Sequence, residues 1–328
     1  MMQNPFDFKY THAVVCRVPN SLKEATFRQR GLSKIEAIDI DKAKEDHNEY
    51  ILTLRKIGLD VIELQSDDTL PDSTFIDCVS VICNGTALIA KPHLISRKKE
   101  AEIVKSVLRK EGLNIVEIKD PIATLDGSDV LFTGREFFVG LSKRTNIIGA
   151  KAVASAFPEY PVALIKLKKG VYHLKAYISV AGPDILAIGS SEIAKDILRQ
   201  IKDISEYKKY HLITLADIAG VNCLYLNNTL IHCCKDELLN SAKLFASKID
   251  YPRIEIKNKE FSKINRYLTC RSLLFTKCKI YSILSSRYYT NLAIIMKKQD
   301  FSQNEDCSQA EIQKCEKNFQ SKTKDNEN

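Results

Sequence analysis

Two carboxylates and a glycine stand directly before an apolar strand in the middle of the chain. Residues 124–129 read Thr-Leu-Asp-Gly-Ser-Asp, so that Asp126 and Asp129 flank a Gly-Ser pair ahead of the apolar segment 130–132. A tight turn and a second apolar segment, 137–140, follow and lead to Arg144. Carboxylates at the mouth of a strand either cap a turn or bind a cation. This stretch alone leaves both interpretations open.

The layout of this stretch recurs along the chain. Each copy has a strand, a polar turn, an amphipathic helix and a second strand, over residues 12–64, 86–118, 137–165, 185–215 and 229–256. A short polar segment accompanies each copy, and one residue of each segment falls on a common period of about 47 to 49 positions: Asp77, Asp126, His173, Asn222 and Cys270. A regular period indicates a repeat architecture. Repeats around an axis bring equivalent positions to one central mouth, so we expect these side chains to converge.

The elements that must position these residues are readable from apolar spacing. Ile103, Val104, Val107 and Leu108 recur at three- and four-residue intervals and predict a helix near 97–110. The same alternation of strands and helices in every copy predicts an α/β protein.

Composition restricts the class of protein. The chain has 328 residues, a net charge of +8 and ten cysteines. The basic residues are scattered and not interleaved with aromatic ones, which disfavours a nucleic-acid partner and favours a small anion. No apolar run reaches the length of a membrane span, and the start lacks a signal peptide. Cysteines without dense spacing predict reduced thiols and no metal site, so we expect a soluble cytoplasmic protein.

With these motifs in view, the chain resembles the dimethylarginine dimethylaminohydrolases of the pentein superfamily. The resemblance covers about residues 11–275. It rests on residues 70–75, 96–100, 124–146, 173–175 and 268–270. No helical insert of the kind found in the related arginine deiminases is visible. The resemblance implies a five-bladed α/β propeller with pseudo-five-fold repeats and the hydrolysis of Nω-methylated arginine to citrulline and a methylamine.

The family pattern also implies catalytic roles. Cys270 would attack the guanidinium carbon and form a covalent thiouronium. His173 would protonate the leaving amine and then activate water. Asp126 and Asp77 would hold the guanidinium through charge-assisted hydrogen bonds. No cofactor and no metal are implied.

Further residues would bind the amino-acid end of the substrate. Arg97 and Arg144 would bind the α-carboxylate, and Asp72 the α-amine. Phe27 would lie in a lid over residues 20–33, and the carbonyl of Ile264 would accept from the substrate. The expected partner is a methylated arginine, with no nucleic acid and no membrane, and the expected oligomeric state is a monomer or a weak dimer.

Several positions depart from the family pattern. Cys78 replaces the aspartate that normally grips the guanidinium nitrogens, and Asp77 replaces a glutamate. Arg266 stands where a glycine is usual, and Ser128 and Ala176 replace a glycine and a serine. A thiol is a weak, uncharged partner. Two alternatives therefore stay open: a catalytically impaired pseudoenzyme that binds a guanidino compound or a protein, and an enzyme acting on a different guanidino substrate.

Structural interpretations compete with each of these roles. Cys270 and His173 would also be ordinary for a buried core, and Arg97 would also suit the solvated face of a charged helix. We expect a catalytic domain over residues 1–276, an extension over 277–298 and a disordered polar tail over 299–328.

Overall fold

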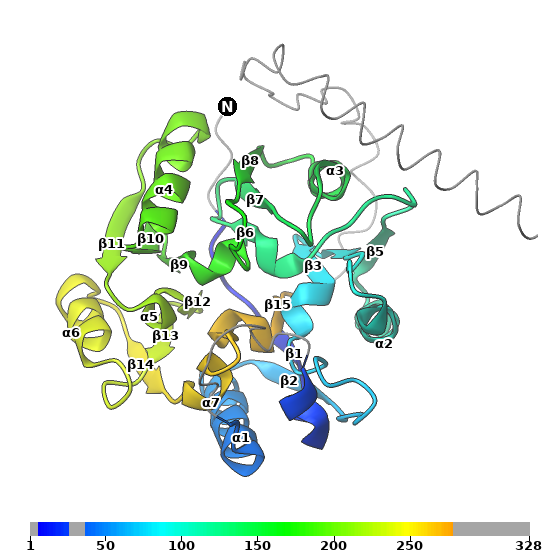
Figure 1. Ribbon diagram of the computed structural model, residues 1–328, viewed down its shortest axis with the longest axis horizontal. Helices are drawn as coiled ribbons and strands as arrows, with labels where there is room; N and C mark the ends of the chain where they lie inside the picture. Colours follow the sequence, from blue (N-terminus) through cyan, green and yellow to red (C-terminus); the bar gives the residue numbers. More distant parts are fainter. Residues whose placement is uncertain (1–5, 26–36, 278–328) are drawn as a thin grey trace, which may run out of the picture. The chain divides into compact units, whose positions relative to one another are not determined.

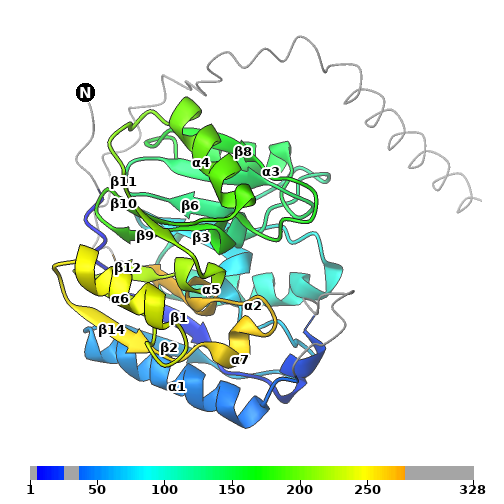
Figure 2. The same cartoon turned by 60° about the vertical axis from the view of Figure 1, so that its left-hand side comes forward.

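The computed structural model describes residues 6–25 and 37–277, which belong to one compact unit of the chain. Phe27, most of the expected lid, the extension from residue 278 onwards and the tail of 299–328 lie outside the described residues. Within them, five three-stranded sheets surround a common centre, and the long helices lie outside the strands (Figures 1 and 2).

The five sheets follow the five repeats read from the sequence. The first contains β1 (His12–Cys16), β2 (Asp60–Leu64) and β15 (Leu273–Phe275). The second contains β3 (Ser80–Cys83), β4 (Thr86–Ile89) and β5 (Asn114–Glu117). The third contains β6 (Val130–Phe132), β7 (Phe137–Leu141) and β8 (Val162–Lys166). The fourth contains β9 (Ile178–Gly182), β10 (Ile185–Gly189) and β11 (His211–Leu215). The fifth contains β12 (Leu224–Leu226), β13 (Thr229–Cys233) and β14 (Arg253–Ile256).

Each sheet has the same topology. Its middle strand pairs antiparallel with one neighbour and parallel with the other, and the parallel pair is joined by a crossover helix. These crossover helices are α1 (Ile40–Lys56), α2 (Lys98–Lys110), α3 (Ile147–Ala156), α4 (Glu192–Ile204) and α6 (Leu239–Lys248). In the first sheet, β1 pairs with β15 from the far end of the described chain, with Ala13 opposite Leu274. The two ends of the ring are thereby closed, and the predicted five-bladed α/β arrangement is confirmed.

The apolar faces of the helices predicted from spacing pack on these sheets. Val104 and Leu108 of α2 are buried in one cluster with Ala87 and Ile89 of β4. Side-chain caps fix the starts of several helices; in α3, the carboxamide oxygen of Asn146 accepts a hydrogen bond of 2.9 Å from the backbone nitrogen of Gly149. The helices are thus held by burial along one face and by defined ends.

In each of the five sheets, a short turn precedes the strand that pairs antiparallel with the middle strand. They are the 3-10 turns η2 (Ile76–Val79), η4 (Gly127–Asp129), η5 (Leu174–Ala176) and η6 (Leu268–Arg271), with the short helix α5 (Ile218–Val221) in the fifth repeat. Turn η2 contacts η4 and η6, and η4 contacts η5. The polar segments of different repeats therefore meet near the centre, as the common period predicts.

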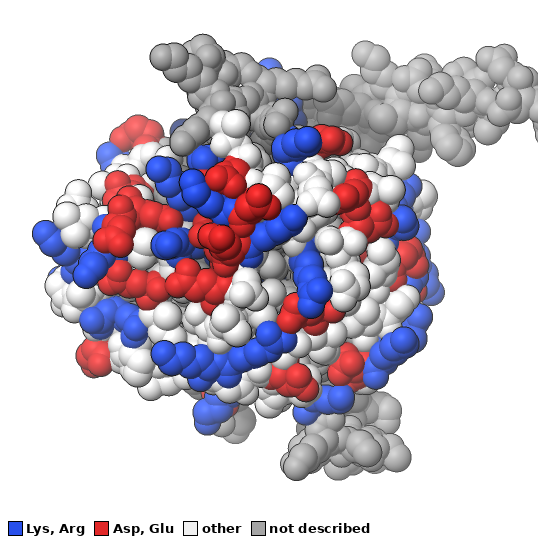
Figure 3. Space-filling model, turned by 90° about the horizontal axis from the view of Figure 1, so that it is seen from below, with Lys and Arg blue, Asp and Glu red and all other residues white. Residues whose placement is uncertain are grey.

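Charge is mixed on the surface seen in Figure 3, where lysine and arginine side chains alternate with aspartate and glutamate. Over residues 6–25 and 37–277, no helix has both the length and the hydropathy needed to cross a membrane. The same residues contain no group of three or more His, Cys, Asp or Glu side chains suited to a metal ion.

The buried imidazole of His47 in α1 leads to a prediction about stability. Burial, together with the nearby guanidinium of Arg271, lowers the pKa of His47 to about 3. In the unfolded chain a histidine titrates near 6.5, so below that pH only the unfolded state gains this proton. Between pH 7 and pH 5 the free energy of unfolding of the wild type should therefore fall by about 2 kcal/mol more than that of His47→Leu. Urea unfolding across this range measures both slopes, and parallel slopes would contradict the expectation.

Candidate active site

Cys270 lies in turn η6 and is 2% exposed. It is packed in an apolar cluster with Cys78, Phe75 and Ile264. The residue before it, Thr269, is held by the side chain of Asn222 from the fifth repeat. The Thr269 backbone nitrogen donates to Asn222 Oδ1 at 2.9 Å, and Asn222 Nδ2 donates to the Thr269 hydroxyl at 2.8 Å. Asn222 also donates to the carbonyl of Lys175 at 2.9 Å. The side chain predicted at this phase of the fifth repeat thus ties the cysteine turn to the histidine turn.

His173 precedes turn η5 and is also 2% exposed. Its Nε2 lies 3.3 Å from Nη1 of Arg266. A guanidinium can only donate, so the imidazole accepts at Nε2. Burial lowers the pKa of His173 well below its ordinary value, and the cation of Arg266 adds to the effect against the opposing Asp126. The imidazole is therefore neutral at pH 7.

Asp126 caps turn η4, where its carboxylate accepts from the backbone nitrogen of Ser128 at 2.9 Å. Burial raises the pKa of Asp126, but the surrounding positive charges outweigh burial and hold its pKa below the ordinary value. Arg144 is one of these charges, with Nε 4.0 Å from the carboxylate. Both interpretations of the sequence therefore apply to Asp126, which caps a turn and also faces cations.

Arg144 reaches the site from the turn after β7 and is the more exposed of the two arginines expected there. Its side chain is 19% exposed. The guanidinium stacks on Tyr172 at 4.3 Å from the ring centroid and donates to the Tyr172 carbonyl at 3.2 Å. Arg144 is thereby held beside both Asp126 and the residue preceding His173.

Arg97 is buried, with 2% exposure, so the interpretation as a solvated helix face is wrong. Its Nη2 donates to Glu100 at 2.6 Å and to the carbonyl of Phe75 at 2.9 Å. A further bond of 3.2 Å reaches the carbonyl of Asp72. Its Nη1 is buried without a hydrogen-bond partner among the described residues. Arg97 thus anchors the loop before η2 and retains donor capacity for an anion.

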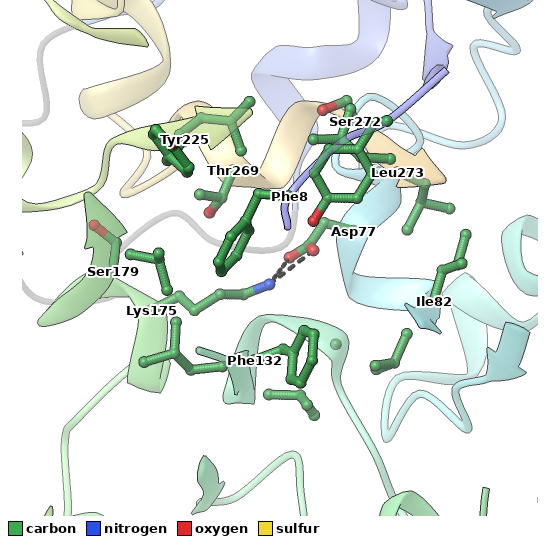
Figure 4. A pocket seen from close by; sticks show the side chains of 18 of the residues that line it. Phe8, Asp77, Ile82, Phe132, Lys175, Ser179, Tyr225, Thr269, Ser272 and Leu273 are labelled. Atoms are coloured by element: carbon green, nitrogen blue, oxygen red, sulfur yellow. Dashed lines mark hydrogen bonds and ion pairs between the residues drawn. The ribbon is translucent and has the colours of Figure 1, made fainter. Parts of the chain in front are cut away.

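Asp77 and Cys78 both lie in the 3-10 turn η2, but their side chains contact different residues. Lys175 binds the Asp77 carboxylate at 2.7 Å, and both line a central cavity of about 150 Å³ together with Phe8, Tyr225 and Thr269 (Figure 4). Cys78 instead packs beside Cys270, with Sγ 3.1 Å from the hydroxyl of Ser128. Burial raises the pKa of Cys78 to about 12, so it is a neutral thiol.

Arg266 is the residue whose position the sequence indicated least. Its side chain is fully buried, at 0% exposure. Its Nη2 lies 3.4 Å from Asp72 Oδ1, and its Nη1 lies 3.4 Å from Cys78 Sγ. The guanidinium stacks over the Phe75 ring at 4.4 Å. Asp72, Cys78 and His173 are therefore brought together around a guanidinium that belongs to the protein itself.

Asp129 is the second of the two carboxylates that flank the Gly-Ser pair, and it links turns from two repeats. Its carboxylate accepts from the hydroxyls of Ser142 at 2.6 Å and Thr145 at 2.8 Å, and from the backbone nitrogen of Leu174 at 3.1 Å. Burial raises the pKa of Asp129 to about 7. These contacts join the turn that carries Arg144 to the turn that follows His173. The sequence signal for Asp129 was its place beside Asp126 in the Asp-Gly-Ser-Asp stretch, directly before strand β6.

The sequence matches the family model described as N,N dimethylarginine dimethylhydrolase, eukaryotic, over residues 19–232. The chain belongs to this family. It is 35% identical to DDAH2 of Homo sapiens over 274 residues, which cover 81% of this chain and 94% of the human protein. It is 25% identical to the N(G),N(G)-dimethylarginine dimethylaminohydrolase of Pseudomonas aeruginosa, over 72% of this chain and 90% of that enzyme. The predicted membership of a hydrolase family of the dimethylargininase type is confirmed.

Solved structures agree with the fold. A cysteine-to-serine variant of the Pseudomonas aeruginosa enzyme, complexed with citrulline, has a TM-score of 0.69 and 25% identity, over 82% of this chain and all of that one. The N-terminal domain of ArgZ, a cyanobacterial arginine dihydrolase, has a TM-score of 0.69 at 16% identity, over 81% of this chain and 98% of that one. At that identity the second likeness concerns the fold alone. The predicted pentein propeller is confirmed.

Proposed function

We propose that the protein hydrolyses Nω-methylated arginine to citrulline and a methylamine. The observation that carries the proposal is that Cys270 and His173 are both buried next to one pair of side chains. Cys270 packs beside Cys78, and Arg266 Nη1 lies 3.4 Å from Cys78 Sγ and 3.3 Å from His173 Nε2. The ionised carboxylate of Asp126 acts on the neutral imidazole of His173. Membership of the dimethylarginine dimethylhydrolase family supports the same reaction. The catalytic unit is the five-bladed domain, assigned to residues 1–276.

In the first half of the reaction the neutral His173 takes the proton of the Cys270 thiol. The thiolate then forms a bond to the guanidinium carbon. The imidazolium gives its proton to the nitrogen that carries the methyl groups, and the bond between carbon and that nitrogen breaks. Dimethylamine leaves, and a thiouronium remains on Cys270.

In the second half, His173 is neutral again and removes a proton from water. The hydroxide adds to the thiouronium carbon, the carbon–sulfur bond breaks and the sulfur recovers a proton from the imidazolium. The new hydroxyl group gives its proton to bulk water as the carbonyl of citrulline forms. Citrulline is released and the thiol is restored. Asp126 stabilises the positive charge that His173 carries in both halves, because an opposite buried charge favours the protonated form.

The amino-acid end of the substrate would be held by the two arginines. Arg144 is partly exposed, and Arg97 has a buried Nη1 available for an anion, so both suit an α-carboxylate. Asp72 would bind the α-amine, and the carbonyl of Ile264 would accept a further hydrogen bond from the substrate. Phe27 is retained as a lid residue. The proposed partner is a small molecule.

A pseudoenzyme of the same fold remains the second candidate, because of one specific observation. Cys78 presents a neutral thiol and Arg266 a cation in the part of the site that would receive a substrate cation. A pseudoenzyme would bind a guanidino compound or a protein without turning it over.

The test is release of the ureido product by the purified full chain, which is citrulline from the three arginine compounds and N-carbamoylputrescine from agmatine. Asymmetric dimethylarginine, monomethylarginine, arginine and agmatine form the substrate panel. Turnover of the methylated compounds supports the proposal, whereas release from arginine or agmatine alone would identify a different guanidino-modifying enzyme. No release from any of the four, with a folded protein, would favour the pseudoenzyme.

Replacement of Arg144 separates the two ends of the substrate. Arg144→Ala should weaken the binding of dimethylarginine by about 1.5–3 kcal/mol, the value of a charge-assisted hydrogen bond. Agmatine, which has no carboxylate, should lose much less. Calorimetric titration of both ligands measures the difference. Equal losses would mean that Arg144 acts only by holding Tyr172 and Asp126.

A further inference from the structure

The surroundings of Arg266 are those that a bound guanidinium ligand requires. A carboxylate accepts at one end of its fork, through Asp72, and an aromatic ring, Phe75, lies under its plane. An imidazole acceptor, His173, faces the other end. Anion, π-face and directional acceptor together are the usual elements of guanidinium recognition. These groups form a binding environment for a guanidinium, and this chain fills it with its own side chain.

The contact with His173 has a chemical meaning. Nη1 of Arg266 lies 3.3 Å from Nε2, the atom that would give a proton to the leaving amine. The same Nη1 lies 3.4 Å from Cys78 Sγ. Nη1 thus stands where the substituted nitrogen of a substrate would have to stand to receive a proton from His173.

The backbone of Arg266 is fixed, so the guanidinium is directed inward by the fold. Its nitrogen donates to the carbonyl of Phe261 at 2.9 Å, and its carbonyl accepts from Asn258 Nδ2 at 3.2 Å. Asn265 before it has a positive φ of 54°, which turns the chain at this point. Displacement of the guanidinium would therefore come from rotation of its side chain, not from movement of the loop.

We propose that Arg266 is an internal occupant of the guanidinium subsite formed by Phe75, Cys78 and His173, where it is held by Asp72, the residue proposed for the substrate α-amine, and that Arg266 determines the specificity of the site. An external guanidinium enters only when the Arg266 guanidinium leaves, so the wild type discriminates against cationic side chains. This inference rests on the proposed function for the identity of the subsite. Its test does not depend on turnover.

The first experiment compares two alkylating reagents of nearly equal size, the cationic 2-chloroacetamidine and the neutral 2-chloroacetamide, on Cys270. The rate ratio of the two reagents on Cys270, divided by their ratio on free cysteine, reports whether the subsite accepts a cation. In Arg266→Ala and Arg266→Met this normalised ratio should rise by about tenfold or more, the size of one charge-assisted contact. Arg266→Met, which keeps a long uncharged side chain in the space beside Phe75, replaces the alanine variant if that variant does not fold. Arg109→Met, exposed on α2, is the matched control and should leave the ratio unchanged.

The second experiment does not use the thiol. Methylguanidinium chloride at millimolar concentration should raise the Tm of Arg266→Ala and leave that of the wild type unchanged, because only the variant has a vacated subsite. An unchanged reagent ratio together with no ligand-dependent rise in Tm would overturn the inference. A different outcome separates this inference from the proposed function. If no variant releases citrulline but the Arg266 variants show the raised reagent ratio and the raised Tm, the hydrolase function is rejected and the role of Arg266 in the subsite is supported.

Discussion

Cys270→Ser is expected to lower kcat for citrulline release from dimethylarginine by at least about a thousandfold. A serine hydroxyl remains protonated near neutral pH, and it is a far poorer nucleophile than the thiolate that His173 can generate. The substitution removes little volume, so the packing with Phe75 and Ile264 should survive. Steady-state assays at saturating dimethylarginine measure the loss, and near-wild-type circular dichroism shows that the fold is retained.

The control for this prediction is another cysteine of the chain. Cys234 is buried but lies in the fifth repeat, at the end of β13, and has no role in the mechanism. Cys234→Ser should keep wild-type activity. Mass spectrometry of rapidly quenched wild type should show the thiouronium adduct on the peptide with Cys270. Retention of most activity in Cys270→Ser, or an adduct on another cysteine, would reject Cys270 as the nucleophile.

The arrangement of the blades could be predicted because a period is a property of the sequence itself. Residues spaced by one repeat occupy equivalent places in successive blades, so the phase of Asp126, His173 and Cys270 was enough to expect convergence. Asn222 at the same phase links two of these turns, a structural role that the period could not separate from a catalytic one.

The direction of individual side chains could not be predicted in the same way. Asp77 and Cys78 form part of a tight turn, and their orientations depend on contacts with Lys175 and Ser128 from other repeats. Arg97 stands at the start of a run of charged residues, which suggested a solvated face. Its burial depends on Glu100 and on carbonyls of the preceding loop. Contacts of this kind, with residues distant in the chain, produce no local sequence pattern from which the direction of a side chain could be predicted.

The last prediction concerns Cys78 and Arg266, where the structure changes what the sequence suggested. From the sequence, Cys78→Asp should raise activity because it restores an anion for the substrate guanidinium. In the structure, Arg266 Nη1 lies 3.4 Å from Cys78 Sγ, so a carboxylate placed there would first bind Arg266. We therefore expect Cys78→Asp alone to give no gain in kcat/KM. Arg266→Gly alone should give a gain, because it opens the subsite.

The double variant should exceed both single variants. With Arg266 absent, the new carboxylate of Cys78→Asp faces the substrate, and one charge-assisted bond of about 1.5–3 kcal/mol corresponds to about one to two powers of ten in kcat/KM. The two effects are then non-additive, because Cys78→Asp raises kcat/KM only when Arg266 is also replaced, whereas Arg266→Gly raises it alone. Measurement of kcat/KM for wild type, both single variants and the double variant gives the coupling directly. Additive effects would show that Arg266 does not compete with the substrate for the group at position 78. Activity found only in the double variant would establish that these two side chains, rather than the thiol and imidazole, hold the wild type in the state of a pseudoenzyme.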